Sequence, residues 1–96
     1  MSYLSNIQDK LRQIKPKLSE KYHVNSIGLF GSIVRTDFTP ESDIDIVVDF
    51  SQPIGVEFID LAEELEILLK RKVDLVSRAG IRPQYYQAIE SDILYV

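Results

Sequence analysis

The sequence contains no cysteine and only one histidine, His23. These absences exclude disulfide-stapled folds, zinc sites built from thiolates and cysteine nucleophiles, and they leave no histidine cluster for a metal. No apolar run approaches the ~18 residues that a membrane span needs, and the N-terminal stretch lacks the apolar segment of a signal peptide. We therefore expect a cytoplasmic protein that does not enter a membrane.

The length limits what the chain can build. It has 96 residues, of which 45% are hydrophobic and 27% are charged, and this composition is ordinary for a globular domain. A chain of this length forms one hydrophobic core and leaves no room for a separate substrate domain. We expect residues 1–96 to form a single domain, so that a large acceptor must bring its own binding surface.

Charge is distributed unevenly along the chain, although the formal net charge is only −4. Residues 37–66 contain ten acidic side chains and no lysine or arginine, whereas residues 1–25 carry five basic and two acidic side chains. The acidic middle argues against a nucleic-acid groove across the whole surface. A concentrated set of carboxylates is instead typical of a cation site.

The hydrophobic pattern predicts alternating helices and strands. Apolar residues from Leu4 to Leu18 recur at spacings of three and four, which predicts an N-terminal amphipathic helix that Pro16 should kink or break. Gly28, inside the first expected strand, predicts a close approach of another segment. Further elements are expected as strands at 26–30, 43–49 and 73–76, a helical turn after 31–32, helices at 58–69 and 84–91, and a docked apolar tail at 93–96. This order predicts a small sheet covered by helices.

Three aspartates are the strongest candidates for a metal site. Asp43 and Asp45 are two residues apart on a predicted strand, so their side chains point the same way, about 6.5–7 Å apart at the backbone. Asp74 lies in the next predicted strand, which is otherwise apolar, and a lone charge there is costly to bury unpaired. If the two strands are neighbours, three carboxylates converge in an oxygen-ligand site that suits Mg²⁺ and is completed by substrate phosphates.

A candidate phosphate site precedes these carboxylates. Gly31 allows backbone amides to approach an anion, and Ser32 adds a hydroxyl at the start of the expected helical turn. A phosphate-binding turn next to a carboxylate pair is the arrangement that metal-assisted phosphoryl or nucleotidyl transfer requires.

The same residues also have structural interpretations. Asp43 and Asp45 could form the solvated face of a half-exposed strand, although aspartate is depleted in strands. Asp74 could pair with Lys72 or Arg71 at the end of its strand. A Gly-Ser step alone is most often a turn.

The run GLFGSIVRTDFTPESDIDIVVDF at 28–50 resembles the signature of the minimal nucleotidyltransferases, a branch of the DNA polymerase beta superfamily. The signature consists of Gly-Ser, an arginine soon afterwards, Ser-Asp-x-Asp, and a third aspartate on a later strand. The resemblance covers nearly the whole chain, because 11–32 resembles the N-terminal helix and first strand and 72–77 the third-carboxylate strand. It implies an α/β (α+β) nucleotidyltransferase fold with a three- to four-stranded mixed sheet and about four helices.

The resemblance also implies a nucleotide site and a metal site. Gly31 and Ser32 would hold the triphosphate of ATP, with Arg35 and Ser42 completing the nucleotide-binding set. The motif position of Arg35 leaves open whether it touches phosphate or braces the loop.

The catalytic set that the family implies consists of Asp43, Asp45 and Asp74. Asp43 and Asp45 would ligate Mg²⁺, with two ions expected. Asp74 would ligate metal and accept the proton of the attacking hydroxyl.

Family members encoded beside HEPN-domain ribonucleases act as antitoxins that transfer AMP to a tyrosine of the toxin. The resemblance therefore implies an adenylyltransferase that modifies a HEPN-type toxin. Two alternatives stay open. A small-molecule nucleotidyltransferase is disfavoured by the short chain, which leaves nothing to form an acceptor pocket, and an antitoxin that acts by binding alone is disfavoured by the three retained aspartates.

Overall fold

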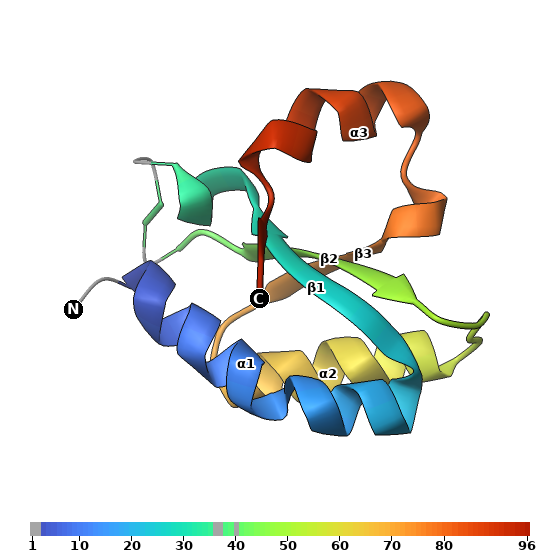
Figure 1. The fold of residues 1–96 in the computed structure, drawn as a ribbon. Coiled ribbons are helices and arrows are strands. Elements are labelled where there is room, and N and C mark those ends of the chain that lie inside the picture. The colour runs from blue at the N-terminus through green and yellow to red at the C-terminus, as the bar shows by residue number, and fades with distance from the viewer. Residues whose placement is uncertain (1–2, 36–37, 40) are drawn as a thin grey trace.

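A computed structural model describes residues 3–35, 38–39 and 41–96. The elements follow one another as α1 (Tyr3–Tyr22), β1 (Val24–Phe30), η1 (Gly31–Val34), β2 (Ile44–Phe50), α2 (Glu57–Leu69), β3 (Val73–Ser77), η2 (Arg78–Gly80), α3 (Pro83–Ile89), η3 (Glu90–Asp92) and β4 (Leu94–Tyr95), where η marks a 3₁₀ turn (Figure 1). Of the loop predicted between the first two strands, residues 36, 37 and 40 lie outside the described residues. A search of the described ranges found no helix with the length and hydropathy of a membrane span.

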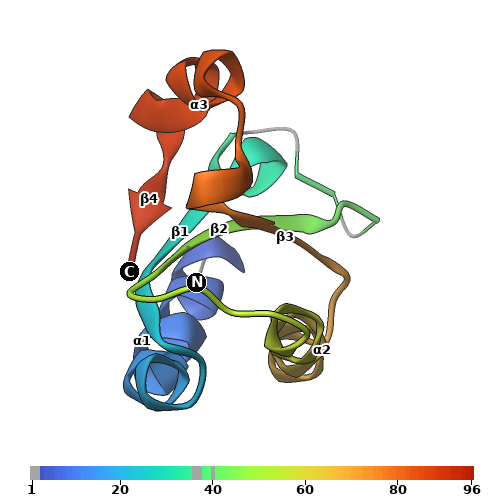
Figure 2. The ribbon, with the colours of Figure 1, turned by 90° about the vertical axis from the view of Figure 1, so that its right-hand side faces the viewer.

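The four strands form one mixed sheet in the order β3-β2-β1-β4. β1 pairs antiparallel with both β2 and β4, whereas β2 and β3 are parallel and are joined through α2. Helices α1 and α2 lie on one face of the sheet and α3 on the other (Figure 2). The predicted α+β fold is confirmed, with β4 as the fourth strand.

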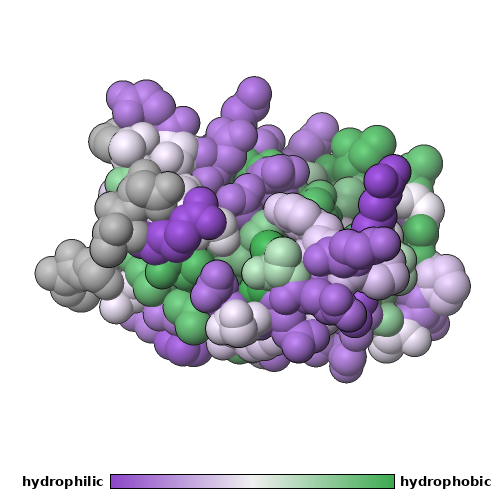
Figure 3. Space-filling model, turned by 90° about the horizontal axis from the view of Figure 1, so that it is seen from above, coloured by the Kyte–Doolittle hydropathy of each residue, from purple (hydrophilic) through white to green (hydrophobic). Residues whose placement is uncertain are grey.

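Strand β2 separates the core from the opposite face of the sheet. Ile44, Ile46 and Val48 are buried in the main core with α1 and α2. Because side chains alternate along a strand, Asp45 and Val47 point to the face on which α3 lies. Figure 3 looks onto this face, where patches of apolar surface lie between hydrophilic side chains. The charged residues of β2 are thus presented on the α3 side.

Helix α1 is continuous from Tyr3 to Tyr22, so of the kink or break predicted at Pro16, the break is wrong. Proline inside a helix removes one backbone hydrogen bond and costs about 3 kcal/mol. Leu11 and Leu18, before and after the proline, are both fully buried. Their burial contributes about 2 kcal/mol each, which is enough to hold the helix on the sheet across Pro16.

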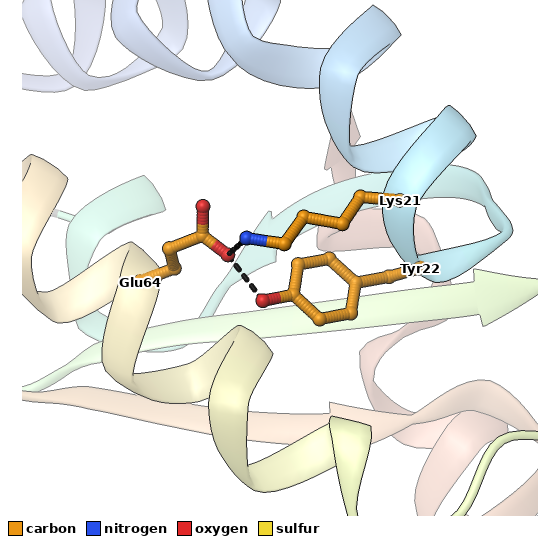
Figure 4. Close-up of polar contacts among 3 residues, drawn as sticks. All are labelled: Lys21, Tyr22 and Glu64. Carbon is orange, nitrogen blue, oxygen red and sulfur yellow. Dashed lines mark hydrogen bonds and ion pairs between the residues drawn. The ribbon is translucent and has the colours of Figure 1, made fainter.

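The end of α1 is tied to α2 through one carboxylate (Figure 4). Glu64 accepts a hydrogen bond from the Tyr22 hydroxyl, and its Oε2 lies 3.3 Å from the Lys21 ammonium. The Tyr22 hydrogen bond, supported by the nearby Lys21 charge, lowers the pKa of the Glu64 carboxyl below its usual 4.5. This contact fixes the C-terminal end of α1 against the middle of α2.

The close approach predicted at Gly28 is confirmed. A Cβ atom at this position would lie 2.5 Å from Cγ2 of Ile93 and 3.2 Å from the ring of Tyr95. The chain after α3 therefore packs closely against β1, with β4 paired beside it, and Val96 N–H donates to the Ile27 carbonyl at 3.0 Å. The predicted docking of the apolar tail is confirmed as well.

Candidate active site

The site begins where β1 ends, at Gly31. Phe30, the last residue of β1, is directly opposite Asp45 in the β1–β2 register. Gly31, which follows β1, therefore lies beside the Asp45 side chain. A Cβ atom on Gly31 would overlap Oδ2 of Asp45 and lie 3.0 Å from its Cγ, and Gly31 also has a left-handed φ of 75°. Both constraints favour glycine, because it lacks a side chain and adopts positive φ at little cost.

The helical turn predicted after Gly31-Ser32 is present as η1. Ile33 is buried and anchors the turn on the core. Arg35 closes it by donating its backbone N–H to the Ser32 carbonyl at 3.1 Å. The turn thus holds Gly31 and Ser32 in a fixed position at the edge of the carboxylate site.

The predicted juxtaposition of strands is confirmed, because β2 and β3 are neighbours. Asp45 and Asp74 are directly paired in the parallel register, and Asp43 immediately precedes β2. Asp45 is half-buried, whereas Asp43 and Asp74 are exposed. The three aspartates that the sequence singled out lie at the same end of two adjacent strands.

The electrostatics of the site centre on Asp45, which is partly removed from water and lies near two other carboxylates. Burial, followed by the charges of Asp74 and Asp43, raises the pKa of Asp45 from its usual 3.8 to about 6, while the guanidinium of Arg35 acts in the opposite direction. An acid whose pKa is raised by nearby acids is stabilised in its ionised form by a bound cation. The site therefore favours a positively charged ligand.

The donor set fits Mg²⁺ bound together with a nucleotide. Among residues 3–35, 38–39 and 41–96, no three carboxylate or imidazole side chains are grouped closely enough to form a metal cage by themselves. Asp43, Asp45 and Asp74 supply only oxygen donors, and Gly31 leaves the space beside Asp45 free of a side chain. Mg²⁺ commonly binds through one or two carboxylates and completes its shell with water and substrate phosphates.

The sequence left open whether Arg71 pairs with Asp74. In the structure, Arg71 binds other partners. Its guanidinium donates to the carbonyl of Ser42 at 2.6 Å and of Thr39 at 3.1 Å, and to the Tyr3 hydroxyl at 3.1 Å. It also lies over the rings of Tyr3 and Phe38, at 5.4 and 5.0 Å from their centroids. Arg71 thus clamps the loop that leads into the carboxylate site.

Ser42 is part of the same loop. Its hydroxyl accepts a hydrogen bond from Thr39 N–H at 3.1 Å, and its carbonyl is the closest acceptor of Arg71. The residue that follows is Asp43, so these contacts fix the backbone from which the first carboxylate projects. Sequence reasoning missed the contact of Arg71 with this loop, because no spacing pattern links the two segments, which are about 30 positions apart.

Comparison with known proteins agrees with this geometry. The family model for the nucleotidyltransferase domain matches residues 11–96. A Methanocaldococcus jannaschii protein named "Putative protein adenylyltransferase" is 45% identical over 100 residues, and the alignment covers 100% of both chains. The protein adenylyltransferase MntA of Thermococcus cleftensis is 38% identical, over 100% of this chain and 98% of its own length.

Two solved structures share the fold of this chain. A minimal nucleotidyltransferase structure superposes with a TM-score of 0.80 at 24% identity, over 98% of this chain and 95% of the other. A toxin–antitoxin structure with AMP-PNP gives a TM-score of 0.73 at 25% identity, over 92% and 70% of the two chains. The family-model match over residues 11–96 and these relatives show that the chain belongs to the nucleotidyltransferase domain family.

Proposed function

We propose that this chain transfers AMP from ATP to a tyrosine hydroxyl of a HEPN-type toxin and thereby acts as its antitoxin, as a single domain in the cytoplasm. The observation that carries the proposal is the contact between Gly31 and Asp45, with Asp74 paired beside Asp45. It sets a phosphate-binding turn against an acidic site. Relatives named as protein adenylyltransferases, and a similar toxin–antitoxin structure with an ATP analogue, favour AMP as the transferred group.

In this proposal the nucleotide binds across the turn and the strand ends. Gly31 and Ser32 hold the triphosphate, and Ser42 completes the nucleotide-binding set. Arg35 contributes positive charge near the phosphates, consistent with its effect on the Asp45 carboxyl. Together these four residues bind and orient ATP for attack at its α-phosphorus.

The three aspartates are the proposed metal ligands, and one of them is the proposed proton acceptor. Asp43, Asp45 and Asp74 would hold two Mg²⁺ ions, which when bound neutralise charge on the entering and leaving oxygens. The carboxylate of Asp74 accepts the proton from the tyrosine hydroxyl. The tyrosine oxygen then forms a bond to the α-phosphorus while the bond to the β-phosphate oxygen breaks, and pyrophosphate leaves. Asp74 is exposed on the outer strand of the sheet, where a large acceptor can reach it.

The test uses a HEPN-domain protein as the acceptor, and the first one to examine is any that the neighbouring reading frame encodes. This protein is incubated with ATP, Mg²⁺ and either the wild type or Asp74→Asn, separated from the antitoxin, weighed by intact mass spectrometry and assayed for toxicity. We expect the wild type to add at least one AMP with lasting inactivation, and Asp74→Asn to bind without modifying. If the wild-type reaction returns an unmodified, active toxin that both proteins neutralise equally while bound, the chain acts by binding alone.

A further inference from the structure

Strand β3 is an edge strand of the sheet and carries Asp74. The Ile44 N–H donates to the Lys72 carbonyl at 2.9 Å, and the register pairs Asp45 with Asp74. In a parallel ladder this means that residues 72, 74 and 76 bond to β2, while the backbone groups of residues 73, 75 and 77 point away from the sheet. Within the described residues no strand lies on that side.

One of these outward groups is already occupied. The Val73 N–H donates to the side-chain carboxylate of Glu66 at 3.0 Å, which covers the start of the edge. The backbone groups of Leu75 and Ser77 lie further along the strand. An unpaired edge of this kind is a ready template for another extended chain.

A groove of about 940 Å³ runs along this part of β3, on the side of α3 and the start of α2. The short chain therefore has room for an acceptor groove, contrary to the expectation from its length. Its lining is mostly apolar and includes Phe58, Val76, Ser77, Ile81, Arg82 and Tyr85. Tyr85 is 53% exposed and adds aromatic surface to the lining of the groove. In Figure 2, β3 is seen between α3 on one side and α2 on the other.

We propose that this groove is the acceptor site of the transfer reaction, an inference that rests on the proposed function. An extended segment of the acceptor protein adds to β3 as a further strand, by hydrogen bonding to the outward backbone groups of Leu75 and Ser77. From Ser77 to Asp74 is three residues, or about 10 Å along a strand. A short added strand therefore delivers one of its side chains, the acceptor tyrosine, to the Asp74 carboxylate.

The chemistry of the groove favours a polypeptide over the adenine base. The free N–H and C=O groups of an edge strand complement another backbone, and the neighbouring apolar surface accepts alternate side chains of an added strand. The groove volume is at the upper end of the range for small-molecule sites, about 300–1,000 Å³. A segment of several residues fills such a groove, and the strand leads directly from it to Asp74.

Ser77→Pro tests the backbone pairing. Ser77 has φ −87° and follows a residue in extended conformation, so proline fits there and removes only the outward N–H, leaving the β2–β3 ladder intact. Ser77→Ala is the matched control, because it removes the hydroxyl and keeps the N–H. With a HEPN-domain protein as acceptor, we expect Ser77→Pro to raise the acceptor KM about tenfold, and Ser77→Ala to match the wild type.

Gly80→Trp tests the groove independently of the strand. A Cβ atom on Gly80 meets nothing within 4 Å, so a large side chain can be added there without displacing the core, and Gly80→Ala serves as its control. We expect Gly80→Trp to raise the acceptor KM at least as much as Ser77→Pro. The ATP-induced rise in melting temperature should stay at the wild-type value in all four variants.

The outcomes separate the two proposals. If the wild type transfers no AMP, the proposed function fails and the acceptor site fails with it. If the wild type is active and both Ser77→Pro and Gly80→Trp keep its acceptor KM, the acceptor groove alone is wrong. If Gly80→Trp instead abolishes the ATP-induced thermal shift while the acceptor KM is unchanged, the groove holds the base and the acceptor assignment is overturned.

Discussion

Gly31 and Asp45 share a space that admits only one side chain. The Asp45 carboxylate occupies the volume that a Cβ on Gly31 would need, and the φ of 75° at Gly31 disfavours other residues independently. Gly31→Ala should therefore lower the free energy of unfolding by about 1–3 kcal/mol and displace the Asp45 carboxylate. We expect the ATP-induced thermal shift to be lost, as measured by melting curves with and without ATP and Mg²⁺.

Gly55→Ala is the control for this change. A Cβ on Gly55 meets only the Glu57 side chain, at an ordinary distance of 3.6 Å, so this variant should retain both its stability and its response to ATP. A Gly31→Ala protein that melts like the wild type and responds normally to ATP would contradict the assigned geometry.

Much of this site follows from local sequence patterns. The alternation of apolar and acidic residues in β2 predicts which side of the strand faces the core, and an acidic residue in the middle of an apolar strand marks Asp74. Strands joined by one helix are commonly parallel neighbours, so the approach of Asp74 to Asp45 follows from chain order. The glycine at 31 is likewise visible in the sequence as a residue that permits close approach.

Other contacts depend on tertiary packing and leave no local signal. Arg71 reaches Ser42 and Tyr3 only because α1, the loop before β2 and the end of α2 converge in space. The continuity of α1 through Pro16 depends on how much apolar surface the helix buries, which the proline itself does not reveal. In both cases the sum of distant contacts outweighs the local preference.

Asp45→Asn should raise the free energy of unfolding of the metal-free protein. The folded-state pKa of Asp45 is raised to about 6, so the ionised carboxylate lowers the free energy of unfolding above that pH. This loss of stability disappears as the pH falls below the ordinary pKa of 3.8. Because Asp45 is only half-buried, solvent screening limits the effect to about 1 kcal/mol. In the presence of a chelator at pH 7.5, we expect the melting temperature to rise by about 4–8 °C.

The same comparison at pH 3.5 should show little difference, since Asp45 is then largely protonated in the folded and unfolded wild type. Asp60→Asn, on the exposed side of α2, removes the same net charge away from the site and should not reproduce the gain. An equal stabilisation by both variants would indicate a general charge effect instead of repulsion within the carboxylate site.

Arg71→Lys should weaken the response to Mg²⁺. Lysine keeps the positive charge but lacks the planar fork that binds the Ser42 and Thr39 carbonyls at once. The loop before Asp43 is then less fixed, so we expect several-fold more Mg²⁺ to be required for half-maximal transfer while the ATP KM at saturating Mg²⁺ changes little. Arg12→Lys, at an exposed ion pair with Asp9, is the control. An unchanged Mg²⁺ dependence in Arg71→Lys would show that the contacts of Arg71 with the loop do not affect Mg²⁺ binding.

Tyr22→Phe should reveal the contribution of the contact between α1 and α2. Tyr22 is 4% exposed and donates to Glu64, whose pKa this hydrogen bond lowers. A lowered folded-state pKa stabilises the protein above the ordinary value of 4.5, and the contribution is lost as pH falls through the folded-state value. We expect Tyr22→Phe to cost about 1–2 kcal/mol in urea unfolding at pH 7.

The pH dependence distinguishes this hydrogen bond from simple packing. Phenylalanine retains the ring in the core, so the difference between Tyr22→Phe and the wild type should narrow as the pH is lowered from 7 and Glu64 takes up its proton. Lys21→Gln removes only the exposed partner and should cost much less at pH 7, because exposed ion pairs contribute little. A penalty in Tyr22→Phe that stays constant between pH 7 and pH 3 would show that the ionised Glu64 carboxylate does not strengthen the contact.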